Sequence, residues 1–215
     1  MPKDTFLNLP LEKQEKIMRA AINEFISNGF EKGNIGTIAK NAGVAKGSMY
    51  QYFENKRELF MFSVKWSIEF LVKKYSTYMT LGNKEINLFE FLYANAKDVW
   101  VQMREERELV IFIQDVFLGK YSGLTDESME YMMKLSNEYL LKLIKDGQNN
   151  GSIRTDIDDN ILTLFITGVS FKIKEHMMSK ARSLGEDIVD EDFSKNERDI
   201  KAMIELLKNG MGSKK

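Results

Sequence analysis

The side chains best suited to chemistry lie close together, in the stretch from residue 46 to residue 52. They carry ammonium, hydroxyl and amide groups, which bond to phosphate oxygens and to the edges of nucleobases: Lys46, Ser48, Tyr50, Gln51 and Tyr52. Gly47 adds no side chain, so the backbone there is open to the close approach of a phosphate. These residue types favour contact with nucleic acid, although two tyrosines on a short helix are also typical of a half-buried core.

Charge is distributed unevenly along the chain. The formal net charge is -1, whereas proteins that bind nucleic acid usually present a basic surface to the phosphates. Between residues 31 and 57, five basic residues stand against two acidic ones, Glu31 and Glu54: Lys32, Lys40, Lys46, Lys56 and Arg57. The segment from Met61 onward is net acidic. Charge alone is compatible both with a nucleic-acid surface and with ordinary surface variation.

The composition argues against catalysis and metal binding. The chain has no cysteine and a single histidine, His176, which excludes disulfides, thiol nucleophiles and cysteine-based zinc sites. A Ser-His-Asp triad would need His176, and no nucleophile-elbow motif accompanies it. We therefore expect no enzyme, no metal site and no cofactor.

Size and hydropathy predict a folded chain outside the membrane. With 215 residues and 43% apolar side chains, the protein can bury one sizeable core or two modest ones. The amino terminus lacks the apolar core of a signal peptide, and no apolar run approaches the roughly 20 residues that cross a bilayer. We expect a cytoplasmic protein with no membrane segment.

Proline and glycine mark the boundaries of the predicted elements. Only two prolines occur, Pro2 and Pro10, and the apolar residues beyond them recur with helical rather than strand spacing. The sequence therefore predicts an all-α fold. The helices are expected at about residues 10–28, 35–41, 45–52, 56–80, 86–104, 106–118, 125–149, 158–184 and 191–209.

The first three helices have the layout of a helix-turn-helix. The second and third are short and are joined by a tight turn at Gly43, which can adopt positive φ. Asn34 stands at the N-cap position of the second helix. We expect a homeodomain-like, three-helix DNA-binding domain over residues 1–55, followed by a larger helical domain over residues 56–215.

The same stretch resembles the amino-terminal domain of the tetracycline-repressor (TetR) family of transcriptional regulators. The resemblance covers about the first 60 residues and rests on positions at the family's spacings: Ala21, Phe25, Gly29, Ile38, Ala39, Ala42, Gly43, Val44, Gly47, Tyr50, Phe53, Lys56 and Leu59. Beyond them only the layout of helices is similar, including the turn at residues 151–156 before a long helix.

The resemblance implies a role for each residue of a DNA-binding surface. In or beside the major groove it places Lys46, Gly47, Ser48, Gln51 and Tyr52. Tyr50 and Lys56 would hold phosphates, and Asn34 and Thr37 would anchor the second helix on the DNA backbone. Three positions depart from the family pattern: Ala45 replaces a capping Ser or Thr, Tyr52 a frequent His, and Gly33 a frequent Thr. The operator sequence therefore cannot be transferred from a relative.

The larger domain is rich in aromatic side chains and methionines. Packing of a helical core accounts for such a composition, but adaptable methionines and bulky rings also suit a pocket for an apolar ligand. The resemblance implies such a pocket among the helices between residues 56 and 149. The candidate lining residues are Trp66, Phe70, Phe89, Tyr93, Trp100, Phe117 and Met132.

The last two predicted helices resemble the pair that joins two protomers in the family. Gly168 and Ser170 would permit close approach of neighbouring helices. A homodimer through this pair also suits DNA binding, because two reading heads about one DNA turn apart recognise a palindrome.

Together these features predict a ligand-responsive regulator, a repressor that binds a palindromic operator as a dimer. Release would follow when a small apolar molecule binds the carboxy-terminal domain. The alternative is a helical-bundle ligand carrier or an interaction protein without DNA binding. The sequence leaves open the effector, the operator and its genes, activation in place of repression, and whether the effector releases or promotes DNA binding.

Overall fold

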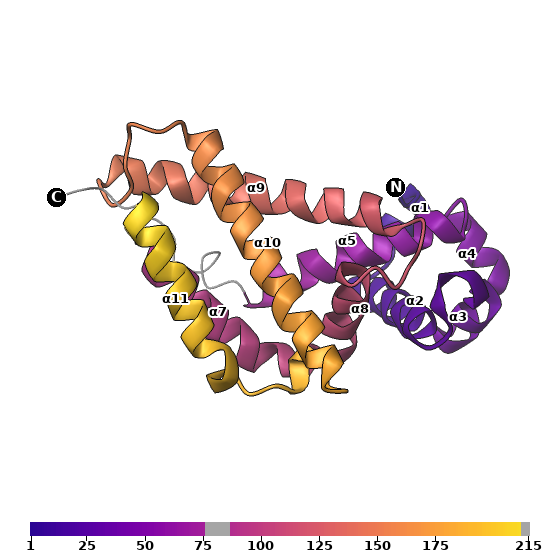
Figure 1. Ribbon diagram of the computed structural model, residues 1–215. Helices are drawn as coiled ribbons and strands as arrows, with labels where there is room; N and C mark the ends of the chain where they lie inside the picture. The colour runs from indigo at the N-terminus through magenta and orange to yellow at the C-terminus, as the bar shows by residue number, and fades with distance from the viewer. Residues whose placement is uncertain (76–86, 212–215) are drawn as a thin grey trace. The chain divides into compact units, whose positions relative to one another are not determined.

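The described part of the chain is helical throughout. The computed structural model describes residues 1–75 and 87–211, and of residues 95, 98–103 and 211 it describes the backbone alone. Within these residues there is no β-strand, which confirms the expected all-α fold (Figure 1). The helices are α1 (Asp4–Leu7), α2 (Leu11–Lys32), α3 (Ile35–Asn41), α4 (Lys46–Tyr52), α5 (Lys56–Tyr75), α7 (Leu88–Gln102), α8 (Arg107–Phe117), α9 (Thr125–Asn149), α10 (Asp159–Ser183) and α11 (Ser194–Met211), with two short 3-10 helices, η1 (Met103–Glu106) and η2 (Ile188–Asp190).

The chain packs as two units. Unit 1 consists of residues 1–70 and 106–129, and unit 2 of residues 71–105 and 130–215. Helix α5 therefore begins in unit 1 and ends in unit 2. The boundary expected between residues 55 and 56 does not coincide with a boundary of these packing units, and it stays a prediction.

Aromatic side chains form the centre of unit 1. Phe60 of α5 lies at the middle of this cluster, with its ring centroid 5.1 Å from that of Phe25, 5.4 Å from that of Phe112 and 4.9 Å from that of Tyr121. Phe25, Phe60 and Phe112 are completely buried. Aromatic pairs at such distances contribute beyond the area that they bury. Residues 106–129 thus complete a core that α2 and α5 begin.

Arg19 of α2 joins the two points at which the chain leaves and re-enters unit 1. Its guanidinium lies over the ring of Phe70, 5.2 Å from the centroid, and its Nη2 lies 2.7 Å from Glu106 Oε2. Phe70 is the last residue of the first segment of unit 1, and Glu106 is the first residue of the second. Burial opposes ionisation, but the carboxylates of Glu15 and Glu106 raise the pKa of Arg19, so the group stays charged.

Unit 2 contains α7, α10 and α11, the end of α5 and the part of α9 from residue 130 onward. Tyr93 of α7 donates from its hydroxyl to Glu197 Oε1 of α11 (2.5 Å), and Thr167 of α10 donates to Asn137 Oδ1 of α9 (2.6 Å). Hydrogen bonds from Lys201 and from Tyr93 hold the pKa of Glu197 below its usual value. These polar contacts fix α7 against α11 and α10 against α9.

Candidate nucleic-acid interface

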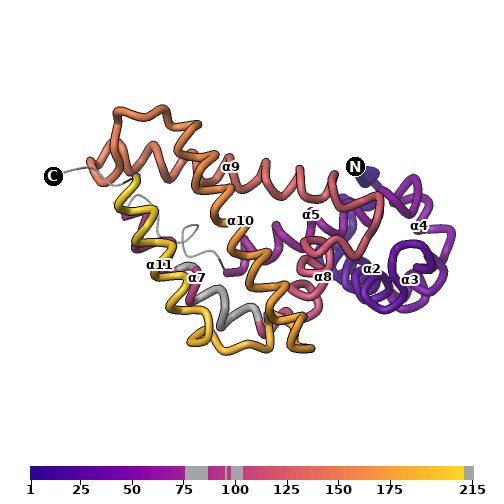
Figure 2. The backbone as a smooth tube through the Cα atoms, in the orientation of Figure 1, coloured from indigo at the N-terminus to yellow at the C-terminus, as the bar shows by residue number. Residues whose placement is uncertain are grey.

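Helices α3 and α4 form the expected helix-turn-helix, and the backbone path between them is short (Figure 2). Asn34 caps α3, because its Oδ1 accepts from the N–H groups of Gly36 (2.7 Å) and Thr37 (3.4 Å). At the other end, Gly43 has φ +69°, and the Val44 N–H donates to the Ala39 carbonyl (2.9 Å). This is a Schellman motif, in which glycine alone takes the left-handed conformation without strain.

The carboxylate of Glu24 fixes the turn before α3. Glu24 is buried, and its Oε1 accepts from the Asn34 N–H at 2.9 Å. Glu24 was not predicted to have such a role, since a glutamate on an amphipathic helix is usually solvated. Its only sequence signal is its position one residue before Phe25, on the buried side of α2.

Gly33 is required by packing. A Cβ at this position would lie 2.9 Å from the Gly29 carbonyl oxygen and 3.1 Å from Phe25 Cδ1. The backbone of α2 kinks at Gly29, where φ is +71°, and the helix continues to Lys32, four residues beyond the expected end at residue 28. The departure from the family's frequent Thr at Gly33 therefore has a steric cause within this chain.

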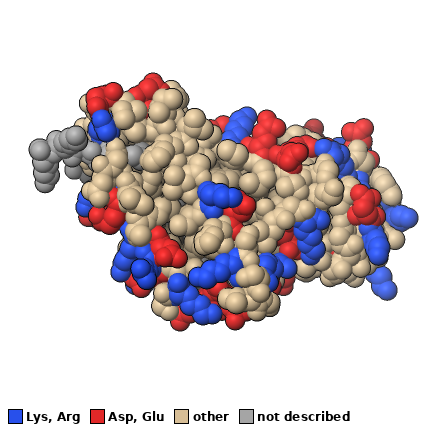
Figure 3. Space-filling model, viewed as in Figure 1, with Lys and Arg blue, Asp and Glu red and all other residues tan. Residues whose placement is uncertain are grey.

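The expected surface residues of α4 differ in exposure. Lys46, Gly47 and Gln51 are exposed, Tyr50 is 48% exposed, and Ser48 is half-buried. Figure 3 shows lysines and arginines projecting over α2–α4, with acidic side chains beside them. On the neighbouring helix Thr37 is exposed too. Helices α3 and α4 thus present the polar groups of Thr37, Lys46 and Gln51 to solvent.

Packing within the described protein does not require a glycine at position 47. A Cβ built there would meet no heavy atom within 4 Å, and its φ lies outside the left-handed region. The methyl side chain of alanine would therefore fit the fold at this position. The space next to the Gly47 backbone is open to a molecule from outside.

Tyr52 and Lys56 are engaged within unit 1. The Tyr52 ring is 7% exposed and lies edge-on to Phe6, with the centroids 5.9 Å apart. The Lys56 ammonium donates to the Glu31 carbonyl (2.9 Å) and the Gly33 carbonyl (3.2 Å), at the C-terminal end of α2. Contact of either side chain with DNA stays a prediction, and what the structure shows is support for the helices around them.

The first turn of α5 is capped by two side chains. Asn55 Oδ1 accepts from the Glu58 N–H (2.9 Å), and Glu58 Oε2 accepts from the Glu54 N–H (2.6 Å). Burial opposes ionisation of Glu58, but hydrogen bonds from the Met1 α-amino group and the Glu54 N–H hold its pKa below the usual value. The carboxylate that ends the loop after α4 is therefore charged at neutral pH.

The candidate residues for a ligand pocket are divided between the two units. Trp66, Phe70 and Phe117 belong to unit 1, where the rings of Trp66 and Phe70 lie 4.9 Å apart. Phe89, Tyr93 and Met132 belong to unit 2, in which Phe89 and Met132 are buried. The side chain of Trp100 lies outside the described residues. A pocket shared by these side chains stays a prediction.

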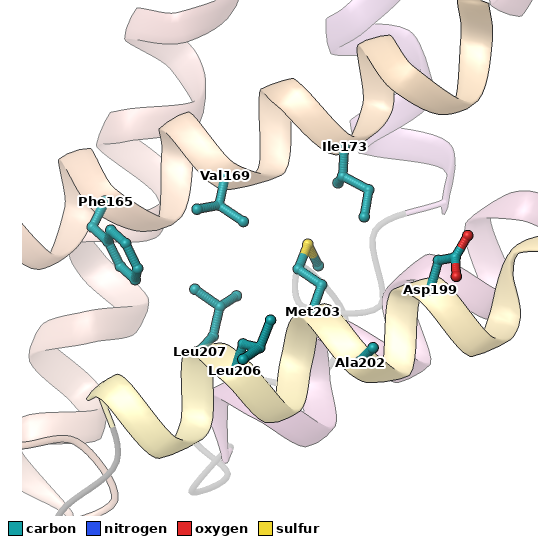
Figure 4. A pocket seen from close by; sticks show the side chains of 8 residues that line it. All are labelled: Phe165, Val169, Ile173, Asp199, Ala202, Met203, Leu206 and Leu207. Carbon is teal, nitrogen blue, oxygen red and sulfur yellow. The ribbon is translucent and has the colours of Figure 1, made fainter. Parts of the chain in front are cut away.

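An open apolar groove lies between α10 and α11 in unit 2. Its volume is about 560 Å³, and in Figure 4 the side chains of the two helices point toward one another across it. It is lined by Phe165, Val169, Ile173, Asp199, Ala202, Met203, Leu206 and Leu207. None of the expected ligand residues lines this groove. It lies instead on the two helices expected to form a dimer interface.

Two classes of site receive no support from the described residues. Across residues 1–75 and 87–211, no cluster of three or more His, Asp or Glu side chains is placed to hold a metal ion. Over the same ranges, no helix combines the length and the apolar character that crossing a bilayer requires.

Comparison with known proteins supports the assignment of the amino-terminal helices. Residues 17–61 match the model of the family described as bacterial regulatory proteins, tetR family. The biofilm operon icaADBC HTH-type negative transcriptional regulator IcaR of Staphylococcus aureus is 25% identical over 147 residues, which are 64% of this chain and 76% of that protein.

Solved structures share the fold along nearly the whole chain. A TetR family transcriptional regulator from Chloroflexus aurantiacus is 26% identical with a TM-score of 0.57, and the match covers 100% of both chains. The transcriptional regulator FadR from Bacillus subtilis, in complex with stearoyl-CoA, is 21% identical with a TM-score of 0.66 over 91% of this chain and 98% of that one. The helix-turn-helix built by α3 and α4, the family match over residues 17–61 and the shared fold show that the amino-terminal part of this chain carries a domain of the tetR family of bacterial regulatory proteins.

Proposed function

We propose that this regulator is a dimeric repressor that binds a palindromic operator through α4 and releases it when a small apolar molecule binds the carboxy-terminal domain. The observation that carries the DNA-binding part is the open space beside Gly47 on a helix that exposes Lys46 and Gln51. Glycine lowers helix stability, and nothing within the described protein requires it at position 47. A phosphate that approaches the backbone does require it.

We assign the DNA contacts to side chains that are at least partly open to solvent. Direct contact is proposed for Asn34, Thr37, Lys46, Gly47, Ser48, Tyr50 and Gln51. For Tyr52 and Lys56 contact with DNA stays a prediction, and we propose that they also hold the helices, since the Tyr52 ring is packed on Phe6 and the Lys56 ammonium is bonded to backbone carbonyls.

The DNA-binding part is tested by selecting duplexes from a random pool with the wild-type protein. The proposal expects a palindromic consensus, with a Kd on the order of 10⁻⁸ to 10⁻¹¹ M that weakens steeply as salt rises. Failure to enrich any duplex sequence would support a carrier or an interaction protein without DNA binding.

Two variants separate backbone contact from base reading. Lys46→Ala is expected to weaken binding to all duplexes alike and to reduce the slope of log Kd against log salt by about 1. Gln51→Ala is expected to relax preference at one base pair, at a cost of about 1–3 kcal/mol. Lys208→Ala serves as control, because Lys208 is exposed on α11 in unit 2. Equal effects of the control and Lys46→Ala would contradict the assignment.

The homodimer is proposed through α10 and α11. The groove between them exposes Leu206 (75%) and Phe165 (51%), and apolar surface of this kind is typical of an interface rather than of solvated helix. Phe165→Glu combined with Leu206→Glu is expected to convert a dimer to a monomer in analytical ultracentrifugation. Leu184→Glu, which alters a leucine that is 63% exposed but does not line the groove, should leave the dimer intact.

The effector is proposed to be a small apolar molecule. The candidate rings and methionines are chemically suited to such a ligand, and the similar FadR was crystallised with stearoyl-CoA. Mass spectrometry of small molecules that co-purify with the protein, followed by their addition to the protein–duplex complex, is the test. Release of the duplex is the expected result. Tighter binding of the duplex would show that the small molecule promotes DNA binding, contrary to the proposal.

We propose that the protein acts in the cytoplasm and has no catalytic activity. A regulator that binds an operator works where the chromosome is. The relatives reported above are regulators of transcription.

A further inference from the structure

Helix α4 depends on another segment for its C-terminal end. The last four carbonyls of an α-helix have no partner within the helix, and in a helix as short as α4 (Lys46–Tyr52) they are most of its acceptors. The Met49 carbonyl accepts from the Phe53 N–H at 2.9 Å, in the ordinary helical pattern. The next three carbonyls cannot be satisfied in this way, because the chain turns away at Phe53, where φ is −131° and ψ is 143°.

Residues 3–5 supply the missing donors. The Lys3 ammonium donates to the Tyr50 carbonyl (3.0 Å), and the Lys3 N–H donates to the Tyr52 carbonyl (2.9 Å). The Thr5 hydroxyl donates to the Gln51 carbonyl. Each of the three remaining carbonyls of α4 therefore has one donor from a segment more than forty residues away in the sequence.

Phe6 anchors this segment. Its side chain is completely buried, with ring centroids 5.9 Å from Tyr52, 4.9 Å from Phe53 and 5.6 Å from Phe62. Because Phe6 follows residues 3–5 directly, these aromatic contacts hold the three residues at the end of α4. Lys3 also places a positive charge at the negative end of the helix dipole.

The opposite end of α4 lacks such support. Ala45, at the N-cap, has no side chain that can accept from the first amides, and no side-chain hydrogen bond caps this end. An N-cap of Ala in place of Ser or Thr lowers helix stability by about 1 kcal/mol. The stability of α4 is therefore concentrated at its C-terminal end.

We infer that residues 3–6 form the C-terminal cap of the recognition helix, and that Lys3 and Thr5 are positioning residues for DNA binding. The part of this inference that concerns DNA rests on the proposed function. The cap fixes the backbone beneath Tyr50 and Gln51, whose side chains face the operator. Loss of one donor lets the end of α4 fray and misplaces both side chains, without removing any group that touches DNA.

Amide hydrogen exchange tests the cap without DNA. In Thr5→Val, the amides of residues 49–53 are expected to exchange about two- to tenfold faster, which corresponds to one lost hydrogen bond. Thr5→Ser keeps the hydroxyl and should restore wild-type exchange. Thr155→Val is the control, since Thr155 is exposed in the turn before α10. Unchanged exchange in α4, or equal acceleration in α2 and α4, would overturn the inference.

A pair of variants at Lys3 separates its two donors. Lys3→Ala removes the ammonium, and Lys3→Pro removes the ammonium and the backbone N–H. Proline fits the backbone at this position, because φ of Lys3 is −74° and proline fixes φ near −65°. The inference expects faster exchange in α4 for Lys3→Pro than for Lys3→Ala, and equal exchange in both would contradict a role for the N–H.

DNA binding provides the second readout. Thr5→Val is expected to weaken binding to the duplex selected by the wild type about two- to tenfold, and Thr5→Ser should restore it. Because Thr5 is uncharged, the dependence of log Kd on log salt should stay unchanged, whereas loss of a phosphate contact by a cation would reduce it. If the wild-type protein selects no duplex, the proposed function fails, and the exchange experiment still decides whether the cap exists.

Discussion

The buried carboxylate of Glu24 shows how a single side chain sets the geometry of the turn before the helix-turn-helix. It accepts from the Asn34 N–H, while the Asn34 side chain accepts from the first amides of α3. The end of α2 and the start of α3 are thereby tied through one residue. The geometry of the turn follows from these three hydrogen bonds rather than from apolar packing alone.

Replacement of Glu24 should destabilise unit 1 selectively. Glu24→Ala leaves the Asn34 N–H without its acceptor, and we expect a loss of about 1–3 kcal/mol in the free energy of unfolding. Urea unfolding measures the change. Glu12→Ala is the matched control, because Glu12 lies on the exposed surface of the same helix, and loss of its ion pair with Lys16 should cost at most about 0.5 kcal/mol. Similar losses in the two variants would refute the role of the buried carboxylate.

Gly47 offers a test in which stability and DNA binding change in opposite directions. Gly47→Ala adds a methyl group in open space and raises helix propensity, so we expect the protein to gain about 0.5–1 kcal/mol of stability. The same methyl group obstructs the approach of a phosphate and should weaken duplex binding. Thermal unfolding and a binding titration measure the two effects. Stronger or unchanged binding by this more stable variant would remove the main support for the proposed DNA contact.

Particular residues show what sequence reasoning could reach and what it could not. The turn at Gly43 and the cap at Asn34 were predictable, because both depend on residue types within a few positions of each other. For the tyrosines of α4 the sequence was compatible both with burial in the core and with exposure to DNA. The structure buries Tyr52 and exposes Tyr50. The cap formed by Lys3 and Thr5 was not predictable, since it joins segments far apart in sequence through backbone acceptors, which leave no trace in residue type. Helix α1 (Asp4–Leu7) was missed because four residues are too few for a periodic pattern.

At the scale of elements, a partly buried charge pair of unit 1 joins α2 to Glu106, the residue directly before α8. Arg19 pairs with Glu106, whose side chain is almost fully buried, and also covers the Phe70 ring. Removal of one partner from such a pair costs more than the pair itself contributes, because the other charge is left without compensation. Helices α2, α5 and α8 are therefore linked through one guanidinium.

A double-mutant cycle measures the link between α2 and α8. The variants Arg19→Met, Glu106→Gln and their combination are expected to give an interaction energy of about 0.5–3 kcal/mol. Lys16→Met and Glu12→Gln form the control cycle, because this pair is exposed on α2, and exposed pairs couple by about 0.2–1 kcal/mol. Coupling in the first cycle no larger than in the second would show that Arg19 does not hold the two helices together.

The start of α5 should make stability depend on pH. The pKa of Glu58 is held below its ordinary value of 4.5, so its contribution to stability is present above that pH and is lost as the pH falls through the lowered pKa. Glu58→Gln removes the charge. The wild type should therefore exceed the variant in stability at pH 6, and the difference should shrink toward pH 3. A difference that is constant over this range would show that ionisation of Glu58 has no part in it.

At the scale of the whole molecule, the unit that contains the helix-turn-helix, unit 1, is built from two separate segments of the chain. The core around Phe25 and Phe60 includes Phe112 and Tyr121, which follow the first segment of unit 2, residues 71–105, in the sequence. The larger domain predicted from residue 56 onward thus contributes part of the core of unit 1. Pattern reasoning assigned α8 to that domain, because periodicity identifies a buried face but not the helix that covers it.

A fragment of residues 1–55 is expected not to fold on its own. It lacks Phe60, Phe112 and Tyr121, so Phe25 would be exposed to water. We expect no cooperative thermal transition in circular dichroism and rapid proteolysis, in contrast to the full chain. Residues 1–129 retain both segments of unit 1 and serve as the comparison. A cooperative transition of the short fragment would establish residues 1–55 as an autonomous domain.

The return of residues 106–129 into unit 1 determines how a hybrid sensor would have to be assembled. A transplant that joins the reading head of this protein to foreign sensing helices at residue 55 would sever Phe60 and Tyr121 from Phe25. Fusion junctions placed after Phe70, before Glu106 and after Met129 would preserve the aromatic cluster and the contacts of Arg19. The part of this protein that could be exchanged for a foreign sensing domain is therefore unit 2, which consists of residues 71–105 and 130–215.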